Sequence, residues 1–401
     1  MCRCRRALYS MPRAKKITLG VTGSIAAYKA AEIASALTTA GHEVRVIMTE
    51  HATRFISPVT FETLTRQKVL VDMFSDEDHR QVSHIEQGTN IDLVLIAPAT
   101  FNIIGKAAQG IADDLLSSVL AAADPKRVLY APAMNVNMFE NPAFQANLAT
   151  LKARGSQFVD PEEGMLACGV YAKGRLAKVP AILDAVESFL TPKPLLGQRV
   201  LITAGATREY IDPIRFLSNA SSGQMGVALA RACRHYGAEV TLLLANSTLD
   251  APGVDVIRVD TVADLYAAAL KAFPETDYLF ATAAVSDFKP TARSDSKIKK
   301  TGSGLNIELV PNTDVLLELS KLKTHQKLIG FAAESEAMLE NAKGKLERKK
   351  LDLIIANSLD NFARTTGKVW LVDPEEIEEL PEMPKSELAF AILDAMLAKG
   401  L

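Results

Sequence analysis

The sequence has few cysteines, few aromatic residues and almost no net charge. Its 401 residues include 6% aromatics and only four cysteines, Cys2, Cys4, Cys168 and Cys233, and the formal net charge is −2. Four unevenly spaced cysteines do not make a disulfide framework, and Cys2 with Cys4 lacks the second ligand pair of a zinc site. We therefore expect a protein of the reducing cytoplasm.

The low net charge and the short apolar runs exclude two classes of partner. Without a global basic surface we expect no nucleic acid, and any bound anion must be held by local clusters. No apolar run approaches the roughly 18 to 20 residues that cross a bilayer, so we expect no membrane association. Residues 1–15 are basic but lack the apolar core of a secretory signal. We interpret them as an N-terminal extension, and we favour a natural start at or near Met11 over the alternative of a transit peptide.

Length and composition predict more than one domain. A chain of 401 residues exceeds the size of about 250 to 300 residues at which one core stops growing. Hydrophobic content of 48% with 23% charged residues is typical of a globular protein. Two prolines and a glycine interrupt the pattern between residues 191 and 197. We predict an extension at 1–15 and domains at 16–190 and 191–401.

Strand-like apolar runs alternate with helical segments in both halves, which is typical of βαβ units. This alternation predicts an α/β fold with two Rossmann-like parallel-sheet domains and ligands at the carboxyl ends of the strands. We expect strands at 17–21, 43–48, 93–97, 128–131, from 199, and at 240–244, 278–281, 327–331 and 352–356, and helices at 27–40, 107–123, 225–236 and 263–273.

Each predicted domain opens with a strand, a glycine turn and a helix, at residues 17–24 and 200–207. A glycine turn lets the backbone approach a phosphate, and the helix start offers unpaired N–H groups to it. Neither turn has the six-residue glycine fingerprint of a dinucleotide site. A mononucleotide is therefore the better prediction, with a purely structural turn as the alternative.

Polar residues follow three strands of the first domain. Gly23 and Ser24 follow the first strand, Thr100 follows the strand at 93–97, and Asn135 follows the strand at 128–131. Hydroxyl and N–H groups suit a phosphate, and an uncharged amide can bind a carboxylate. Helix capping is the alternative interpretation of Thr100 and Asn135, and a purely structural turn is the alternative for Gly23 and Ser24.

His84 and Cys168 carry the remaining reactive side chains of the first domain. A lone histidine is more often structural, and Cys168 can be a small buried hydrophobe. Glycines around Cys168 and at Gly174 favour a ligand-covering flap instead of a core strand. A thiol on such a flap could donate a proton.

Five stretches of the first domain together resemble one family. The stretches at 23–25, 97–100, 132–138 and 166–169, with Gly174-Arg175, resemble the flavin-dependent cysteine decarboxylases, specifically the phosphopantothenoylcysteine decarboxylases. In that family FMN oxidises the substrate's cysteinyl thiol to a thioaldehyde, which eases loss of carbon dioxide, and the resulting enethiol is then reduced by the flavin. The chain departs from the family pattern at Ile103 and Ala172.

The resemblance implies a role for each matching residue. His84 would act in the decarboxylation, Asn135 would bind the substrate carboxylate and Cys168 would protonate the enethiolate. The FMN cofactor would rest on Gly23, Ser24, Thr49 and Thr100.

In the second domain, residues 211–226 carry the most specific pattern. Ser221, Ser222 and Gly223 precede a helix that begins near Gln224, which predicts an anion nest. Serine capping is the alternative, but it does not require the preceding Arg215 and Asn219. Asp287 follows a strand, Lys297 lies on a loop, and Lys345 and Lys349 share a helix face. A carboxylate that can hold a metal ion and lysines that can bind phosphates are the groups that nucleotidyl transfer needs. The alternative interpretation is that these lysines are simply exposed to solvent, as lysines in such runs usually are.

With residues 330–334 and 351–357, this pattern resembles the phosphopantothenate–cysteine ligases, and both halves together resemble the bifunctional coenzyme A biosynthesis proteins of bacteria. The resemblance implies that CTP activates the carboxylate of 4'-phosphopantothenate as an acyl-cytidylate, from which the amine of cysteine displaces CMP. Asn219 and Lys297 would be catalytic, and Asp287 would hold Mg²⁺. The residues implied to contact CTP are Ala281, Thr282, Ala283, Asp287, Lys297, Thr313, Asp314, Val315, Leu316, Phe331, Lys345 and Lys349.

The same resemblance implies a homo-oligomer, with a trimeric or dodecameric decarboxylase core and dimeric ligase domains. An alternative from another class of protein is a subunit that binds ligands but catalyses no reaction. The presence of His84, Asn135 and Cys168 argues against it. An NAD-dependent reductase would need the longer glycine fingerprint, which neither turn supplies.

Overall fold

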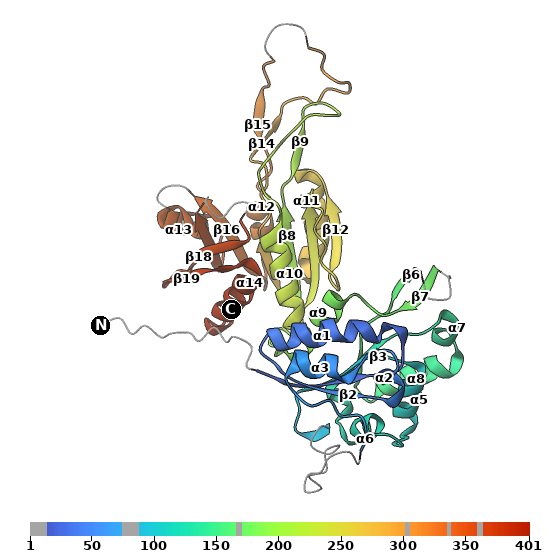
Figure 1. Cartoon of the computed structure of the whole chain (residues 1–401). Helices are drawn as coiled ribbons and strands as arrows, with labels where there is room; N and C mark the ends of the chain where they lie inside the picture. Colours follow the sequence, from blue (N-terminus) through green and yellow to red (C-terminus); the bar gives the residue numbers. More distant parts are fainter. Residues whose placement is uncertain (1–13, 74–87, 166–170, 301–304, 335–337, 359–363) are drawn as a thin grey trace. The chain divides into compact units, whose positions relative to one another are not determined.

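The computed structural model describes residues 14–73, 88–165, 171–300, 305–334, 338–358 and 364–401. The chain divides into two compact units, Met1–Leu190 and Thr191–Leu401. Each unit is built on its own large sheet, as Figure 1 shows. Among the described residues, none of the helices has the length and hydropathy needed to cross a bilayer.

The first unit contains a five-stranded parallel sheet in the order β2-β1-β3-β4-β5. All residues of β3 and β4 are buried, because helices cover both faces of the sheet and a central parallel strand must then be apolar throughout. The strand order changes direction between β1 and β3, which opens a ligand crevice at their carboxyl ends. The strands are β1 (Lys16–Val21), β2 (Glu43–Met48), β3 (Leu93–Ala99), β4 (Val128–Pro132) and β5 (Gln157–Phe158).

Helices form two layers around this sheet. Ile33 of α1, Phe61 of α3 and Ile182 of α9 belong to the core on one face. Ile104 of α5 and Phe144 of α8 belong to the core on the other face, with residues of α6. The helices are α1 (Tyr28–Thr39), α2 (Glu50–Thr53), α3 (Pro58–Thr65), α5 (Phe101–Gln109), α6 (Leu115–Ala122), α7 (Val136–Phe139), α8 (Pro142–Ala153) and α9 (Val179–Leu190), and a hairpin joins β6 (Glu162–Met165) to β7 (Tyr171–Arg175).

The predicted single helix at 107–123 is wrong. Helix α5 ends where Gly110 adopts a left-handed conformation with φ of 73°. Asp114 is the N-cap of α6: its carboxylate accepts from Ser117 N–H, while Asp114 N–H donates to the Ser117 hydroxyl. A glycine C-terminal cap and a capping box therefore divide one apolar run into two helices.

The second unit contains an eight-stranded sheet in the order β12-β11-β8-β13-β16-β17-β18-β19. Its first six strands are parallel, and the last two pair antiparallel, which the sequence patterns did not predict. Its strands are β8 (Arg199–Gly205), β11 (Glu239–Ala245), β12 (Asp255–Val259), β13 (Tyr278–Ala281), β16 (Lys327–Glu334), β17 (Leu353–Ser358), β18 (Thr366–Val372) and β19 (Ile377–Pro384).

Helices cover this second sheet as well. Leu265 of α11, Leu319 of α12 and Leu346 of α13 join one core cluster. Helices α10 and α14 pack against each other, and α10 also packs on β8. The helices are α10 (Gln224–His235), α11 (Val262–Ala272), α12 (Val315–Lys321), α13 (Met338–Arg348) and α14 (Lys385–Ala398).

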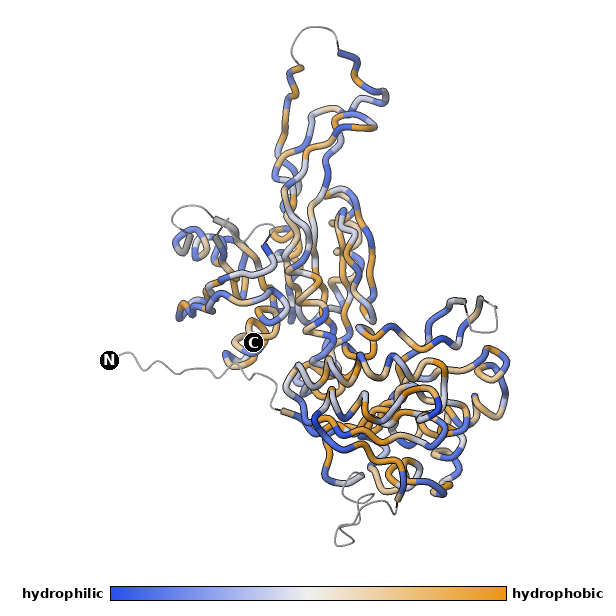
Figure 2. Tube along the Cα trace, in the orientation of Figure 1, coloured by the Kyte–Doolittle hydropathy of each residue, from blue (hydrophilic) through white to orange (hydrophobic). Residues whose placement is uncertain are grey.

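Two small antiparallel ribbons extend from the second unit beyond β8, and we call them the arm. One ribbon pairs β9 (Arg208–Tyr210) with β10 (Phe216–Ser218), and the other pairs β14 (Phe288–Pro290) with β15 (Leu309–Pro311). Figure 2 shows hydrophobic and hydrophilic residues interspersed along the arm, whereas hydrophobic residues follow the strands of the large sheets. The arm therefore carries apolar side chains outside the sheet core.

Candidate active sites

Three loops of the first unit are joined at the carboxyl edge of its sheet. The Thr49 N–H after β2 donates to the Val21 carbonyl at 3.0 Å. The buried Thr22 hydroxyl donates to the Pro98 carbonyl at 2.7 Å, and the Thr100 N–H donates to Thr22 Oγ1 at 3.2 Å. The loops after β1, β2 and β3 therefore form one continuous edge, at which the predicted FMN residues lie.

Ser24 and Thr49 cap short helices. Ser24 Oγ accepts from Ala26 N–H at 3.3 Å, and Thr49 Oγ1 accepts from Ala52 N–H at 3.3 Å. Thr100 makes no side-chain cap in α5 and contacts Thr22 instead. A capping hydroxyl keeps its proton available as a donor, so Ser24 and Thr49 can still bind a phosphate oxygen.

Gly23 has no room for a side chain, because an added Cβ would lie 2.6 Å from the His51 Cβ. The turn after β1 therefore packs directly on the start of α2. Thr22 was not predicted, although its position between an apolar strand and Gly23 was a usable signal.

The loop of Asn135 is held by the β6–β7 hairpin. Asn135 caps α7 by accepting from Asn137 N–H at 2.8 Å, and Met134 N–H donates to the Gly174 carbonyl at 3.0 Å. Gly174 has φ of +139°, and a Cβ there would lie 2.5 Å from the Met134 carbonyl oxygen. The hairpin and the Asn135 loop thus meet backbone to backbone.

Two predicted catalytic residues, His84 and Cys168, lie outside the described residues. Of the two departures from the family pattern, Ile103 is buried in the core and Ala172 pairs with Gly164 in the hairpin.

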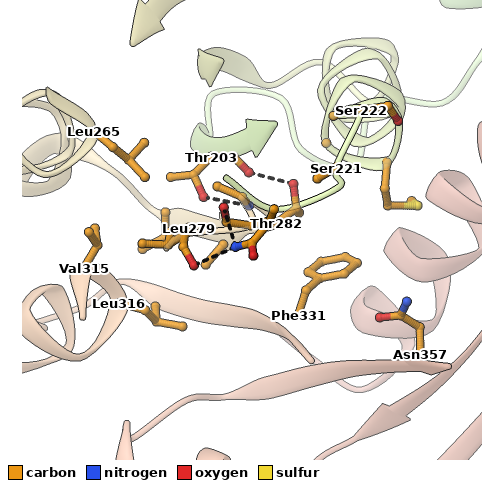
Figure 3. A pocket seen from close by; sticks show the side chains of 18 of the residues that line it. Thr203, Ser221, Ser222, Leu265, Leu279, Thr282, Val315, Leu316, Phe331 and Asn357 are labelled. Atoms are coloured by element: carbon orange, nitrogen blue, oxygen red, sulfur yellow. Dashed lines mark hydrogen bonds between the residues drawn. The ribbon is translucent and has the colours of Figure 1, made fainter. Parts of the chain in front are cut away.

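A cavity of about 630 Å³ opens in the second unit at the carboxyl ends of β8, β13 and β16 (Figure 3). Every residue predicted for the ligase reaction lines it except Lys297. The predicted residues that line it are Asn219, Ala281, Thr282, Ala283, Asp287, Thr313, Asp314, Val315, Leu316, Phe331, Lys345 and Lys349. Residues separated by up to 130 positions in the chain therefore meet around one space.

Glycines bring the start of α10 to this cavity. Gly223 occupies the N-cap with φ of +81°, and a Cβ at Gly226 would lie 2.4 Å from Ala204 Cβ and 2.5 Å from Thr282 Oγ1. Ser222 Oγ accepts only at 3.5 Å from Gln224 N–H, so ordinary serine capping describes this helix start poorly. The close packing leaves the first turn of α10 facing the cavity, where its N–H groups favour an anion.

Hydrogen bonds also hold the segment that follows β13 against β8 and Asn219. Thr282 Oγ1 donates to the Thr203 carbonyl at 2.6 Å, and Ala283 N–H donates to Thr203 Oγ1 at 3.3 Å, two of the contacts in Figure 3. Asn219 Nδ2 donates to the carbonyls of Ala284 and Val285 at 3.3 and 3.1 Å. Asn219 is therefore held at the cavity wall, and Thr203 is a supporting residue that the sequence motifs did not reveal.

Charged side chains of both signs line the cavity. Lys349 Nζ lies 2.7 Å from Asp314 Oδ2, and Asp314 also caps α12 by accepting from Leu317 N–H. Lys345 lies one turn earlier on α13, and Asp287 is exposed on the loop after β13. Carboxylate oxygens suit Mg²⁺ and ammonium groups suit phosphates, so the cavity has the donors that a metal-bound nucleotide requires.

Lys297 is exposed, and the structure does not bring it to the cavity. The next residue is anchored, because Ile298 N–H donates to Asp212 Oδ2 at 3.2 Å and the Ile298 carbonyl accepts from Arg215 Nη2 at 3.1 Å. Burial opposes ionisation of Asp212, but N–H donors from Ile214, Arg215 and Ile298 and the charge of Arg215 outweigh it and lower its pKa. Asp212 and Arg215 therefore tie down the base of the Lys297 loop.

Lys385 and Asn312 also line the cavity without having been predicted. Lys385 begins α14 and Asn312 follows β15. Lys385 has no local motif, because α14 joins the cavity only in the folded unit, whereas Asn312 directly precedes the predicted stretch from Thr313 to Leu316.

The two units define a class of protein: an α/β flavoprotein-type domain followed by an α/β domain with a nucleotide-sized cavity. The sequence matches the flavoprotein family over residues 5–191 and the "DNA/pantothenate metabolism flavoprotein C-terminal domain" over residues 195–399. It is 43% identical to the coenzyme A biosynthesis bifunctional protein CoaBC of Bacillus subtilis, over 96% of this chain and 97% of that protein. It is 44% identical to a cysteine/cysteine sulfinic acid decarboxylase of an unknown prokaryotic organism, over 85% of this chain and 99% of that protein.

Among solved structures, the C-terminal domain of a CoaBC protein matches with 35% identity and a TM-score of 0.46, over 52% of this chain and 100% of that one. The chain belongs to the family of bifunctional coenzyme A biosynthesis proteins. It is an enzyme with phosphopantothenate–cysteine ligase and phosphopantothenoylcysteine decarboxylase activities. The predicted fold class and family are confirmed.

Proposed function

We propose that the second unit uses CTP to ligate 4'-phosphopantothenate to cysteine, and that the first unit decarboxylates the product with FMN. The observation that carries the ligase half is the cavity at which Asn219, Asp287, Lys345 and Lys349 converge. A carboxylate oxygen of the substrate attacks the α-phosphorus of CTP and pyrophosphate leaves. The cysteine amine then attacks the acyl carbon, CMP leaves, and the amide is formed.

The charges around the cavity fit these steps. Asp287 would hold Mg²⁺, whose charge neutralises the triphosphate, and Lys345 and Lys349 would bind phosphate oxygens. Asn219, fixed by the carbonyls of Ala284 and Val285, would orient the acyl-cytidylate. Family resemblance alone supplies the catalytic role of Lys297, whose exposed loop Asp212 anchors.

The carboxyl edge of the first sheet fits FMN by the chemistry of its donors. Ser24, Thr49 and Thr100 offer hydroxyl groups beside the tightly packed Gly23, which suits a phosphate. When bound, FMN would supply oxidation and later reduction of the substrate's sulfur-bearing carbon. Asn135 would hold the substrate carboxylate until carbon dioxide leaves. Family resemblance supplies the roles of His84 in decarboxylation and of Cys168 as the proton donor.

One purified sample tests both halves. The protein should be yellow, with a flavin absorption spectrum, and should release pyrophosphate from CTP only when 4'-phosphopantothenate is present. Adding cysteine should then yield CMP and, after decarboxylation, 4'-phosphopantetheine. A flavin-containing protein that turns over ATP but not CTP would refute the nucleotide assignment, and colourless protein that gains no activity with added FMN would refute the cofactor assignment.

Free cysteine is a second candidate substrate of the first unit, because the relative that is 44% identical is a cysteine/cysteine sulfinic acid decarboxylase. The ligase cavity on the same chain favours the larger, acylated substrate. Decarboxylation rates with free cysteine and with phosphopantothenoylcysteine distinguish them. We expect kcat/KM to favour the acylated substrate by at least about a hundredfold, because binding of its remote groups contributes to catalysis.

We also propose that the chain forms a homo-oligomer. Ile25, Tyr28 and Val59 of the first unit are each at least 60% exposed, and Ile214 and Phe288 of the arm are more than half exposed. Large exposed apolar side chains favour burial between subunits. Light scattering on the intact protein should give a multiple of the 43.3 kDa chain mass, and a monomer at all concentrations would contradict the proposal.

A further inference from the structure

Thr207 is a fully buried threonine that lies between β8 and β9, where the chain leaves the large sheet for the arm. It lies beside the segment after β13, because Ala206 and Ala284 form a parallel bridge at this point. Thr207 itself does not line the ligase cavity. Its hydrogen bonds nevertheless reach the two stretches of chain that carry Asn219 and Asp287, and both of these residues line it.

The side chain of Thr207 holds the loop that leads into Asp287. Thr207 Oγ1 accepts from the Ser286 N–H at 3.0 Å, and Ser286 is itself buried. On the other side, the Asp287 carbonyl accepts from the Asn312 N–H at 2.7 Å. The backbone around Asp287 is therefore held at both flanks, while Asp287 itself is exposed at the cavity.

The main chain of Thr207 holds the stretch that carries Asn219. The Ser218 hydroxyl donates to the Thr207 carbonyl at 2.8 Å. The Thr207 N–H donates to the Ala284 carbonyl at 3.4 Å, and the same carbonyl accepts from Asn219 Nδ2 at 3.3 Å. The residues directly before Asn219 and Asp287 are thus both bonded to Thr207.

We propose that Thr207 is a positioning residue for ligation, which sets Asn219 and Asp287 relative to each other. A displacement of about 1 Å in a catalytic group can lower a rate by about a hundredfold, so groups that act on one substrate need a common support. A buried residue with bonds to both stretches provides that support. This inference rests on the proposed roles of Asn219 at the acyl-cytidylate and of Asp287 at Mg²⁺.

Four substitutions in the intact protein separate these contacts. Thr207→Val keeps the shape of the side chain but removes the acceptor of the Ser286 N–H, whereas Thr207→Ser retains a hydroxyl. Ser218→Ala removes only the donor to the Thr207 carbonyl. Thr276→Val is the control, because Thr276 is buried in the same unit and donates to the Ala272 carbonyl at 3.0 Å but does not line the cavity.

The ligation rate and the calorimetric affinity for CTP, with Mg²⁺ and with EDTA, are the two readouts. We expect Thr207→Val to lower the kcat of ligation by about tenfold or more, because Asn219 and Asp287 lose their alignment. Its affinity for CTP should fall by about threefold or more in Mg²⁺ and stay unchanged in EDTA, because Asp287 contributes through the metal ion. Thr207→Ser and Thr276→Val should stay within about threefold of the unmodified chain in both readouts.

A double-mutant cycle tests the path through Asn219. Ser218→Ala should lower kcat by about threefold in the unmodified chain and have no further effect in Asn219→Ala, because Ser218 acts by placing Asn219. Ser218 is exposed, so this cycle decides the question even where the buried Thr207→Val does not fold.

Two results would overturn the inference. One is a full effect of Ser218→Ala in the Asn219→Ala background. The other is a Thr207→Val variant whose kcat and metal-dependent affinity equal those of Thr276→Val. All variants are compared with the nucleotide that the unmodified chain uses, so failure of that chain to use CTP would count against the proposed function alone.

Discussion

At the scale of single residues, Asn219 combines a fixed position with an uncharged amide. Two main-chain carbonyls hold its Nδ2 at the cavity wall. We expect Asn219→Ala to lower the rate of ligation by about a hundredfold, because a positioned hydrogen-bonding group at the reacting centre is lost. Amide product formed from CTP, phosphopantothenate and cysteine measures this. Decarboxylation in the same sample is the control, and unchanged ligation would remove Asn219 from the catalytic residues.

Gly226 and Gly344 form a matched pair of helix glycines. A Cβ at Gly226 would collide with Ala204 and Thr282, whereas a Cβ at Gly344 meets nothing within 4 Å. We expect Gly226→Ala to destabilise the protein by about 1–3 kcal/mol and to raise the KM for CTP, because α10 must move from the sheet. Gly344→Ala should stabilise it by up to about 1 kcal/mol, since alanine is the better helix former. Denaturant unfolding checks both, and equal effects would contradict the packing argument.

Sequence motifs revealed those site residues whose signals are local. Asn219 and the serines before α10 lie in one short stretch, as do Thr313 to Leu316, so their pattern is visible without the fold. Lys385 and Thr203 give no such signal. Lys385 lines the cavity only because α14 packs beside α10, about 160 positions earlier in the chain, and Thr203 acts through hydrogen bonds to the end of another strand.

At the scale of elements, Asp212 ties the loop that carries Lys297 to the segment before β10. Its lowered pKa means that the folded state favours the ionised carboxylate. The resulting stability is present above the unfolded pKa of about 3.9 and is lost as pH falls through the lower folded pKa. Asp212→Asn should therefore lower the melting temperature at neutral pH. Below about pH 4, the melting temperature of this variant should fall less steeply with decreasing pH than that of the unmodified protein.

The exposed Asp250, which lies 3.6 Å from Arg258, provides the control for this experiment. Asp250→Asn should leave the melting temperature nearly unchanged, because exposed ion pairs contribute little. If Asp212→Asn retained the full acid dependence of the unmodified protein, the carboxylate would not be the anchor of the Lys297 loop.

The β6–β7 hairpin depends on Gly174. Its φ of +139° and the 2.5 Å approach of an added Cβ to the Met134 carbonyl oxygen leave no place for alanine. We expect Gly174→Ala to displace the Asn135 loop and to reduce decarboxylation at least about tenfold. Gly155→Ala is the control, because Gly155 has φ of +101° but the sole close approach of its Cβ would be to Cγ of the flexible Lys126 side chain, at 2.8 Å. It should lose stability but keep the decarboxylation rate, and equal loss of rate would refute the docking role.

The elements themselves were predictable where the patterns were strong. The buried parallel strands are nearly continuous apolar runs, and the predicted strands at 43–48 and 278–281 coincide with β2 and β13. The break between α5 and α6 was missed because apolar residues continue on both sides of Gly110. Strand β19, with its sequence Ile-Glu-Glu-Leu-Pro-Glu-Met-Pro, was missed because glutamates and prolines are unusual in strands and are tolerated at the sheet edge.

At the scale of the whole molecule, each unit has its own sheet and core. We therefore expect a substitution in one unit to leave the reaction catalysed by the other unit nearly unchanged. Gly174→Ala should keep its ligation rate within about twofold, as should the decarboxylation rate of Asn219→Ala, because each change lies within one core. Separate assays of the half-reactions measure this. A large loss of both activities from either substitution would show that the units function as one.

The pairing of Lys349 with Asp314 has a consequence for the order of events at the ligase cavity. The carboxylate that begins α12 already neutralises this lysine at 2.7 Å, so an incoming anion must compete with it. A ligand of high negative charge displaces Asp314 from Lys349 more easily than one of low charge. We therefore expect a bound nucleoside triphosphate to displace Asp314 from Lys349 more readily than a monophosphate does, and the ion pair to re-form after pyrophosphate has left.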